Sequence, residues 1–235
     1  MKKNRMMRAA SVLLIAVMLT TSVISGTFAK YTTSGTATDT ARVAKWGVTI
    51  TETTDSKLFS DAYAFHDASS PSANSVLSQT TDLVVAPGTD KAESTNFTIA
   101  GQPEVSVHVG YEGVVNLENW VVGGNYYCPL VVTVGTTTLS GLDYTDADDF
   151  ESDIEAAIAA VSENYGVGTD LSAASDDLSI SWSWPFEGST GIIHATNVQD
   201  NAKDTALGNA GTDVDPSGTP ATINVAVTCT VTQID

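Results

Sequence analysis

The chain has 235 residues, of which 28 are acidic and 10 are basic, so its formal net charge at pH 7 is −18. A surface this negative repels nucleic acid and anionic lipid, which excludes both as predicted partners. A hydrophobic content of 42% argues against global disorder, and the length is sufficient to bury a sizeable core. No Pro/Gly/Ser-rich linker divides the chain, so we expect one large domain.

Residues 1–29 have the three-part layout of a secretory signal peptide. A basic tip precedes an apolar run from about residue 12 to residue 24, and small residues follow. We predict cleavage after Ala29, with Thr27 at the small −3 position, so that the mature chain begins at Lys30. The alternative is a retained transmembrane anchor, but the apolar run is shorter than the roughly 20 residues that cross a bilayer. Only an uncleaved signal would therefore contact the membrane.

Removing this segment leaves six basic residues against 28 acidic ones, a net charge of about −22. The new N-terminus, residues 30–43, is rich in Thr, Ser and Ala and contains no Pro. Its β-propensity is high, but its apolar content is too low to anchor a core. It is either a flexible terminus or an arm that acts as a strand awaiting a partner. The residues of this predicted assembly arm are Lys30, Tyr31, Thr32, Thr33, Thr36, Thr38 and Val43.

Residues 44–235 are predicted to form the globular domain, because alternating apolar and polar residues recur along them. Strands are expected over residues 45–53, 82–85, 95–100, 105–111, 130–134, 178–186 and 221–233. In the first, Trp46, Val48 and Ile50 share one face of a half-buried strand. The last alternates over its whole length, and so long a strand with an apolar face usually lies inside a sheet.

One helix is predicted, over about residues 146–164. Thr145 can cap its N-terminus, and acidic residues crowd its first turn, where the helix dipole favours them. Apolar residues follow at helical spacing as far as Tyr165. Many strands with a single helix on a crossover predict a mainly β fold, a jelly-roll-like β-sandwich.

No arrangement typical of catalysis occurs. The three histidines, His66, His108 and His194, do not have the spacing of zinc ligands on one element. An acidic cluster could bind calcium as the only predicted cofactor, although acidic loop residues are usually just solvated. The residues of this candidate site are Asp200, Asp204, Asp213 and Asp215.

Two cysteines, Cys128 and Cys229, are the only ones in the chain. In an exported protein they could form one disulfide. The alternative is two free thiols buried in a β core.

The segment Gly26-Thr27-Phe28-Ala29, followed by Lys30-Tyr31, resembles the signal end of substrates of the SipW-type signal peptidase. These substrates include the TasA, CalY and camelysin family of Gram-positive bacteria. Residues 46–50 stand where the family has its first strand, and residues 85–89 and 96–99 resemble its Pro-Gly turn and the next strand. The ending, residues 227–233, is similar to the closing strand of that family.

This resemblance implies a secreted jelly-roll subunit of biofilm-matrix fibres, located in the extracellular matrix or at the cell surface. The implied partners are the signal peptidase and copies of the chain itself, with the N-terminal arm of one subunit completing a sheet of the next. Two alternatives remain. One is an adhesin or other binding module that uses Trp120, Tyr126 and Tyr127 as an exposed surface. The other is a metallopeptidase like camelysin, for which this sequence has no recognisable zinc motif.

Overall fold

The structure is a computed structural model, and it describes residues 7, 9–18, 40–52, 58–64, 74–95, 97–173, 178–186 and 200–235. The chain divides into two compact units, residues Met1–Val43 and Ala44–Asp235. In the first unit, residues 9–18 are helical, and Val43 is 91% exposed. Over the ranges described, no helix combines the length and the apolar character needed to span a membrane.

Most of the residues predicted to act in export and assembly lie outside the described residues. This holds for the cleavage residues and for the greater part of the arm, namely Thr27, Ala29, Lys30, Tyr31, Thr32, Thr33, Thr36 and Thr38.

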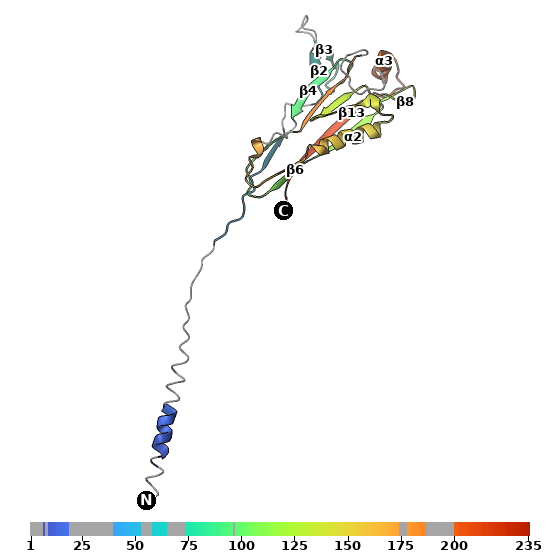
Figure 1. The fold of residues 1–235 in the computed structure, drawn as a ribbon. Coiled ribbons are helices and arrows are strands. Elements are labelled where there is room, and N and C mark those ends of the chain that lie inside the picture. The colour runs from blue at the N-terminus through green and yellow to red at the C-terminus, as the bar shows by residue number, and fades with distance from the viewer. Residues whose placement is uncertain are drawn as a thin grey trace. The chain divides into compact units, whose positions relative to one another are not determined.

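The second unit is mainly β, as predicted (Figure 1). Its strands are β1 Thr49–Glu52, β2 Ala62–Ala64, β3 Asn74–Leu77, β4 Asp90–Thr95, β5 Phe97–Ala100, β6 Val107–Glu118, β7 Val121–Val122, β8 Asn125–Tyr126, β9 Val131–Val134, β10 Thr137–Ser140, β11 Glu163–Tyr165, β12 Ser179–Ser183 and β13 Thr222–Gln233. Its helices are α2 Ala147–Ala160 and α3 Asn201–Asn209, with short 3-10 turns η1 Gly141–Asp143 and η2 Leu171–Ala173.

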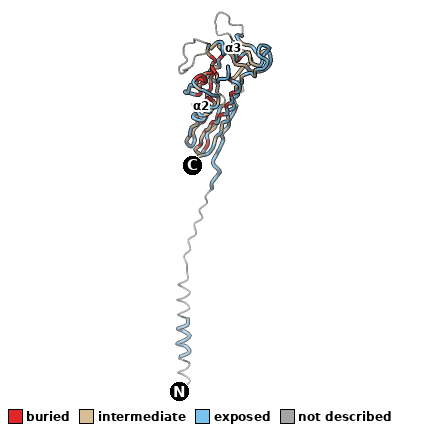
Figure 2. The backbone as a smooth tube through the Cα atoms, turned by 90° about the vertical axis from the view of Figure 1, so that its right-hand side faces the viewer, coloured by how far each residue is buried: buried red, intermediate tan, exposed pale blue. Residues whose placement is uncertain are grey.

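Two antiparallel sheets enclose the core. One has the strand order β10-β9-β12-β4, and the other has the order β11-β6-β13. Buried side chains of both sheets and of α2 belong to one apolar cluster, which is consistent with a β-sandwich. In Figure 2 the buried residues gather in this layer, whereas α3 is largely exposed.

The longest pairing in the fold joins β6 to β13. All twelve residues of β13 face residues of β6, from Thr222 opposite Glu118 to Gln233 opposite Val107. On β6, side chains alternate strictly between buried and more exposed, and Val107 and Leu117 lie at the two ends of the buried row. Period-two alternation between Val105 and Tyr111 predicted this strand, and the strand continues to Glu118 because the alternation itself continues.

Three strand predictions need correction here. The strand expected over residues 95–100 is divided, because Thr95 ends β4 and Phe97–Ala100 form β5 in another sheet. The strand expected over residues 45–53 is only β1, Thr49–Glu52, which pairs with β5 at the exposed surface. Ile50 is 41% exposed, so the strand is not half-buried. The strand expected over residues 82–85 is reduced to an isolated bridge between Ser60 and Val84.

The prediction of a single helix in this unit is wrong, because α3 is a second one. The predicted helix, α2, is also shorter than expected. It begins after Asp146, whose carboxylate accepts a hydrogen bond from the Asp149 N–H at 3.0 Å, so Asp146 rather than Thr145 is the N-cap. It ends at Ala160, and residues 163–165 form β11 on the edge of β6. Tyr165 continues the helical spacing of apolar residues, but it lies in β11 and pairs directly with Val107 of β6. Strand pairing therefore decides its conformation, rather than the helical pattern of the sequence.

Close contact between α2 and β6 depends on Gly113. A Cβ built on Gly113 would lie 2.6 Å from Cδ1 of Ile158, which is fully buried and has little room to move. We therefore expect Gly113→Ala to destabilise the protein by about 1–3 kcal/mol, the usual cost of overpacking a core. Thermal or urea unfolding measures this change.

The matched control is Gly110→Ala on the same strand. Gly110 lies on the outward face, and its Cβ would meet the ring of His108, with the nearest atom at 3.2 Å, and the Thr230 carbonyl oxygen at 3.9 Å, an ordinary contact distance. We expect this variant to unfold within about 0.5 kcal/mol of the parent, as surface substitutions usually do. Equal stability of the two variants would contradict the close packing of α2 on β6.

Candidate assembly edge

Strand β13 has a partner on one side only. It pairs with β6, and among the described residues no strand lies along its other side, so it is the edge of the three-stranded sheet. This differs from the prediction that residues 221–233 lie inside a sheet. The apolar alternation of β13 is that of a buried strand, but its position is that of an edge.

The backbone of β13 directs every second residue toward the open side. In an antiparallel pair, hydrogen-bonded residue pairs alternate with pairs whose polar groups point away from each other. The Ile234 N–H donates to the Ser106 carbonyl oxygen at 2.9 Å, which assigns the even residues to the β6 side. The odd residues therefore present their N–H and C=O groups to the open edge. They are Ile223, Val225, Val227, Cys229, Val231 and Gln233.

Side chains of the same odd residues form an apolar row that faces the core and is only half covered. Each residue from Ile223 to Val231 in this row is intermediate in exposure and packs against the core cluster. The facing row on β6 is buried, with Val109 at 3% exposure and Val115 at 4%. The sandwich is therefore well packed over β6 and incomplete over β13.

Edge strands are normally protected against pairing with other chains by Lys, by Pro or by other charged residues. The sequence of β13, Thr-Ile-Asn-Val-Ala-Val-Thr-Cys-Thr-Val-Thr-Gln, contains none of these. It combines high β-propensity with zero charge over twelve residues. Such a strand is chemically suited to accept another strand.

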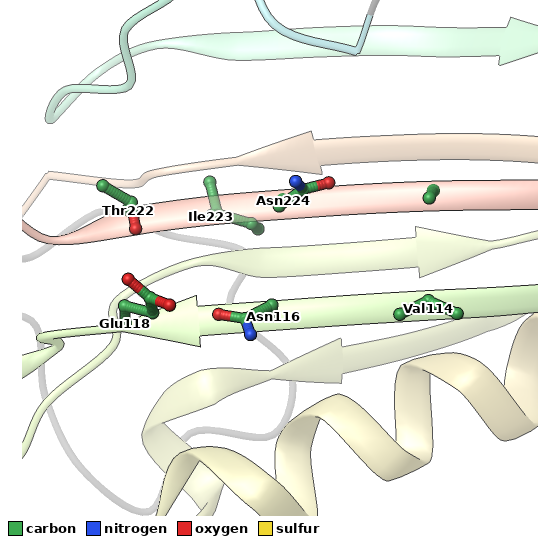
Figure 3. A pocket seen from close by; sticks show the side chains of 7 residues that line it. Val114, Asn116, Glu118, Thr222, Ile223 and Asn224 are labelled. Atoms are coloured by element: carbon green, nitrogen blue, oxygen red, sulfur yellow. The ribbon is translucent and has the colours of Figure 1, made fainter.

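A shallow hollow lies on the outward face of the same two strands (Figure 3). It is lined by Ile223 and by three facing pairs, Val114 with Ala226, Asn116 with Asn224 and Glu118 with Thr222. The pairs present one carboxylate and several neutral polar groups, without a histidine or a paired nucleophile and base. We assign no chemistry to this hollow.

The aromatic residues predicted as an exposed binding surface are mostly buried, and this prediction is wrong. Trp120 is 1% exposed and Tyr127 is 4% exposed, while Tyr126 is half-buried. Their role is structural. The Trp120 indole N–H donates to the Thr222 carbonyl oxygen at 2.8 Å and holds the start of β13. The Tyr127 hydroxyl donates to Asp204 Oδ1 at 2.8 Å and so fixes α3, and burial raises the Tyr127 pKa.

The four aspartates predicted as a calcium site do not come together. Asp200 caps α3 by accepting from the N–H groups of Ala202 and Lys203, and Asp204 is buried against Tyr127. Asp213 and Asp215 lie exposed in the loop that follows. Throughout the described ranges, no group of three or more His, Cys, Asp or Glu side chains could hold a metal ion.

Both cysteines are free thiols in the structure, so the disulfide considered as one alternative is not formed. Cys128 is fully buried, and burial raises the pKa of its thiol to about 12. Cys229 lies in the half-covered row of β13, and burial raises its thiol pKa as well. The two thiols thus differ sharply in solvent exposure. The reactivity of Cys229 can therefore be used to probe the candidate edge.

The sequence did not show that Glu151 and Glu155 of α2 contact β6. Glu155 Oε1 accepts from the Val115 N–H at 2.9 Å, and Glu151 Oε1 accepts from the Leu117 N–H at 2.5 Å. The sequence feature that could have predicted these contacts is the spacing of the two glutamates, four residues apart beside the apolar face of the helix. Two solvent-exposed glutamates would show the same spacing.

Thiol labelling tests this description of the edge. Because the thiolate is the reactive form, we expect one thiol per chain, Cys229, to react with a small disulfide reagent at pH 8 in the native monomer. Cys128 should react at least about 100-fold more slowly, since burial raises its pKa to about 12 and solvent does not reach it. Absorbance of the released thiolate gives both rates.

The control is Cys229→Ser, which should leave no fast-reacting thiol, whereas both thiols of the parent should react after unfolding in denaturant. Two native thiols with equal rates, or none reactive after unfolding without reductant, would contradict the free and unequal pair.

Comparison of this chain with protein family models, with curated proteins and with solved structures found no match.

Proposed function

We propose that the protein is a secreted structural subunit, rather than an enzyme, that assembles head to tail into extracellular fibres. The arm of one copy, residues 30–43, adds as a strand to the open edge of β13 in the next copy. The observation that carries this proposal is the charge-free, twelve-residue strand β13, whose outer edge has no strand partner among the described residues and whose apolar row is half covered. Strand addition of this kind draws affinity from backbone hydrogen bonds and specificity from alternate side chains.

The arm matches the edge in length and pattern. It has 14 residues, and the edge offers 12. If it is extended, its odd residues lie on one face, where Tyr31, Ala37, Ala41 and Val43 are apolar and Thr33, Gly35 and Asp39 lie between them. Side chains of this size can cover the row from Ile223 to Val231 and complete the core. The finer fold that we propose is accordingly a jelly-roll-like sandwich that a neighbouring copy completes.

Charge also favours this pairing. The arm carries Lys30 and Arg42 against the single acid Asp39, whereas residues 44–235 carry four basic and 27 acidic residues. A weakly positive arm is thus attracted to a strongly negative body, while two bodies repel each other at range. The contact is heterologous and does not close on itself, so it propagates into a filament.

Residues 1–29 supply the export step of the proposal. The basic tip, the apolar run and the small residues before Lys30 support cleavage by a signal peptidase of SipW type, which would free the arm. We place the mature protein in the extracellular matrix or at the cell surface on the same ground.

Truncation and a single proline test the two halves of the contact. We expect the chain from Lys30 to form filaments in negative-stain microscopy, and a chain starting at Lys45 to remain monomeric because it has no arm to donate. Val227→Pro in the chain from Lys30 should also abolish filaments, because it removes an N–H that points to the open edge. Proline is tolerated on an edge strand at such a position.

Mixing the two defective chains supplies the control. The truncated chain can still accept an arm, and the Val227→Pro chain can still donate one, so sedimentation should show heterodimers without filaments. A matched variant, Thr228→Pro, removes an N–H on the β6 side and should unfold the domain, as circular dichroism can show. Filaments formed by the chain from Lys45, or by Val227→Pro, would refute the proposed contact.

A further inference from the structure

Strand β6 has a second edge, opposite β13, and this edge is occupied by side chains rather than by a long strand. β11 pairs only with Val107–Val109 at its beginning. Beyond that, three N–H groups of β6 donate to side chains of α2 and the turn after it. Tyr111 donates to Ser162 Oγ at 3.0 Å, Val115 to Glu155 Oε1 at 2.9 Å and Leu117 to Glu151 Oε1 at 2.5 Å.

The spacing of the two glutamates matches the strand. Four residues along a helix advance about 6 Å, and two residues along a strand advance about 6.8 Å. Glu151 and Glu155 are four apart, and their donors Leu117 and Val115 are two apart, so successive carboxylates meet successive edge N–H groups. Backbone groups of a helix bond internally, so only its side chains can satisfy a strand edge. A charged acceptor makes these bonds stronger than neutral ones.

The apolar face of α2 fixes the carboxylates in place. Phe150, Ile154 and Ile158 are at most 1% exposed, and Ile158 lies where a side chain at Gly113 would be. Glu151 and Glu155 flank this face at intermediate burial. The helix therefore cannot slide along β6 without losing both the packing and the hydrogen bonds.

We infer that α2 is an edge guard, that is, an element that prevents another strand from pairing with the edge of β6 opposite β13. Its Glu151 and Glu155 carboxylates occupy the N–H groups that an incoming strand of a second copy would use, so the three-stranded sheet accepts a strand at β13 alone. Removal of the two acceptors opens a second strand-accepting edge on β6 and permits lateral association between copies. The guard is a property of the folded domain and holds whether or not the arm is the natural donor.

The test uses the chain with Glu151→Ala and Glu155→Ala, since alanine preserves the helix. Hydrogen exchange of the Val115 and Leu117 amides should become at least tenfold faster, and sedimentation velocity should show new concentration-dependent association. The double variant Glu151→Gln/Glu155→Gln retains a neutral acceptor oxygen at each position, so its exchange should accelerate less than that of the alanine variant, and its association should resemble that of the parent. Asp148→Ala/Asp149→Ala removes the same charge from exposed positions of α2 and should change neither readout.

Unchanged exchange at both amides would overturn the inference. Faster exchange without new association would overturn it as well, because the uncovered edge of β6 would then not accept a strand. If the double variant fails to fold, Glu155→Ala alone decides the matter. It should accelerate exchange at Val115 and leave Leu117 within about threefold of the parent, and equal acceleration at both amides would refute the paired contacts. Exchange reports on α2 and β6 alone, so its outcome is separate from that of the arm experiments.

Discussion

The fold depends on the twelve-residue antiparallel ladder between β6 and β13. Both strands alternate with the same period, and both direct their odd residues toward the core. Only β6 is enclosed, because it has β11 and α2 along its far edge and the second sheet over its inner face. β13 has the alternating pattern of an enclosed strand, but no strand among the described residues lies along its outer edge. This difference between two otherwise similar strands is the feature that a function must explain.

Among the described residues, α2 contacts one edge of this sheet through hydrogen bonds, and the other edge, β13, has no strand beside it, so the two edges are not equivalent. Natural β-proteins usually blunt every exposed edge with charge, proline or a covering element. Here the covering element lies on β6, where Glu151 and Glu155 replace a strand, while β13 has neither Lys nor Pro. This difference between the edges supports our proposal that copies add in line rather than in bundles.

Local patterns predicted what depends on local chemistry. Strict alternation identified β6, β12 and β13, and the acidic first turn identified α2, because side-chain period and helix capping are properties of a few consecutive residues. Position within a sheet is not such a property. Nothing in the sequence of residues 222–233 shows whether the strand lies at the edge or in the interior of a sheet. The residues around Trp120 likewise do not show that its side chain is buried. Glu151 and Glu155 likewise acquire their partners only from strand residues more than 30 positions away.

Electrostatics and hydrogen bonding act over different ranges in this molecule, and their combination limits which contacts can form. The body carries about 23 net negative charges, so two copies repel each other beyond contact, and screening over roughly 8–10 Å at physiological salt weakens this repulsion only in part. Backbone pairing acts only within hydrogen-bond distance. A contact between copies is therefore favoured through a segment that is not itself acidic, and residues 30–43, with two basic residues against one acidic one, are the segment that we propose for it. Higher salt should consequently relax the repulsion between bodies before it weakens a strand-to-strand contact. Any added tendency to associate laterally under those conditions would then depend on whether the β6 edge remains covered by α2.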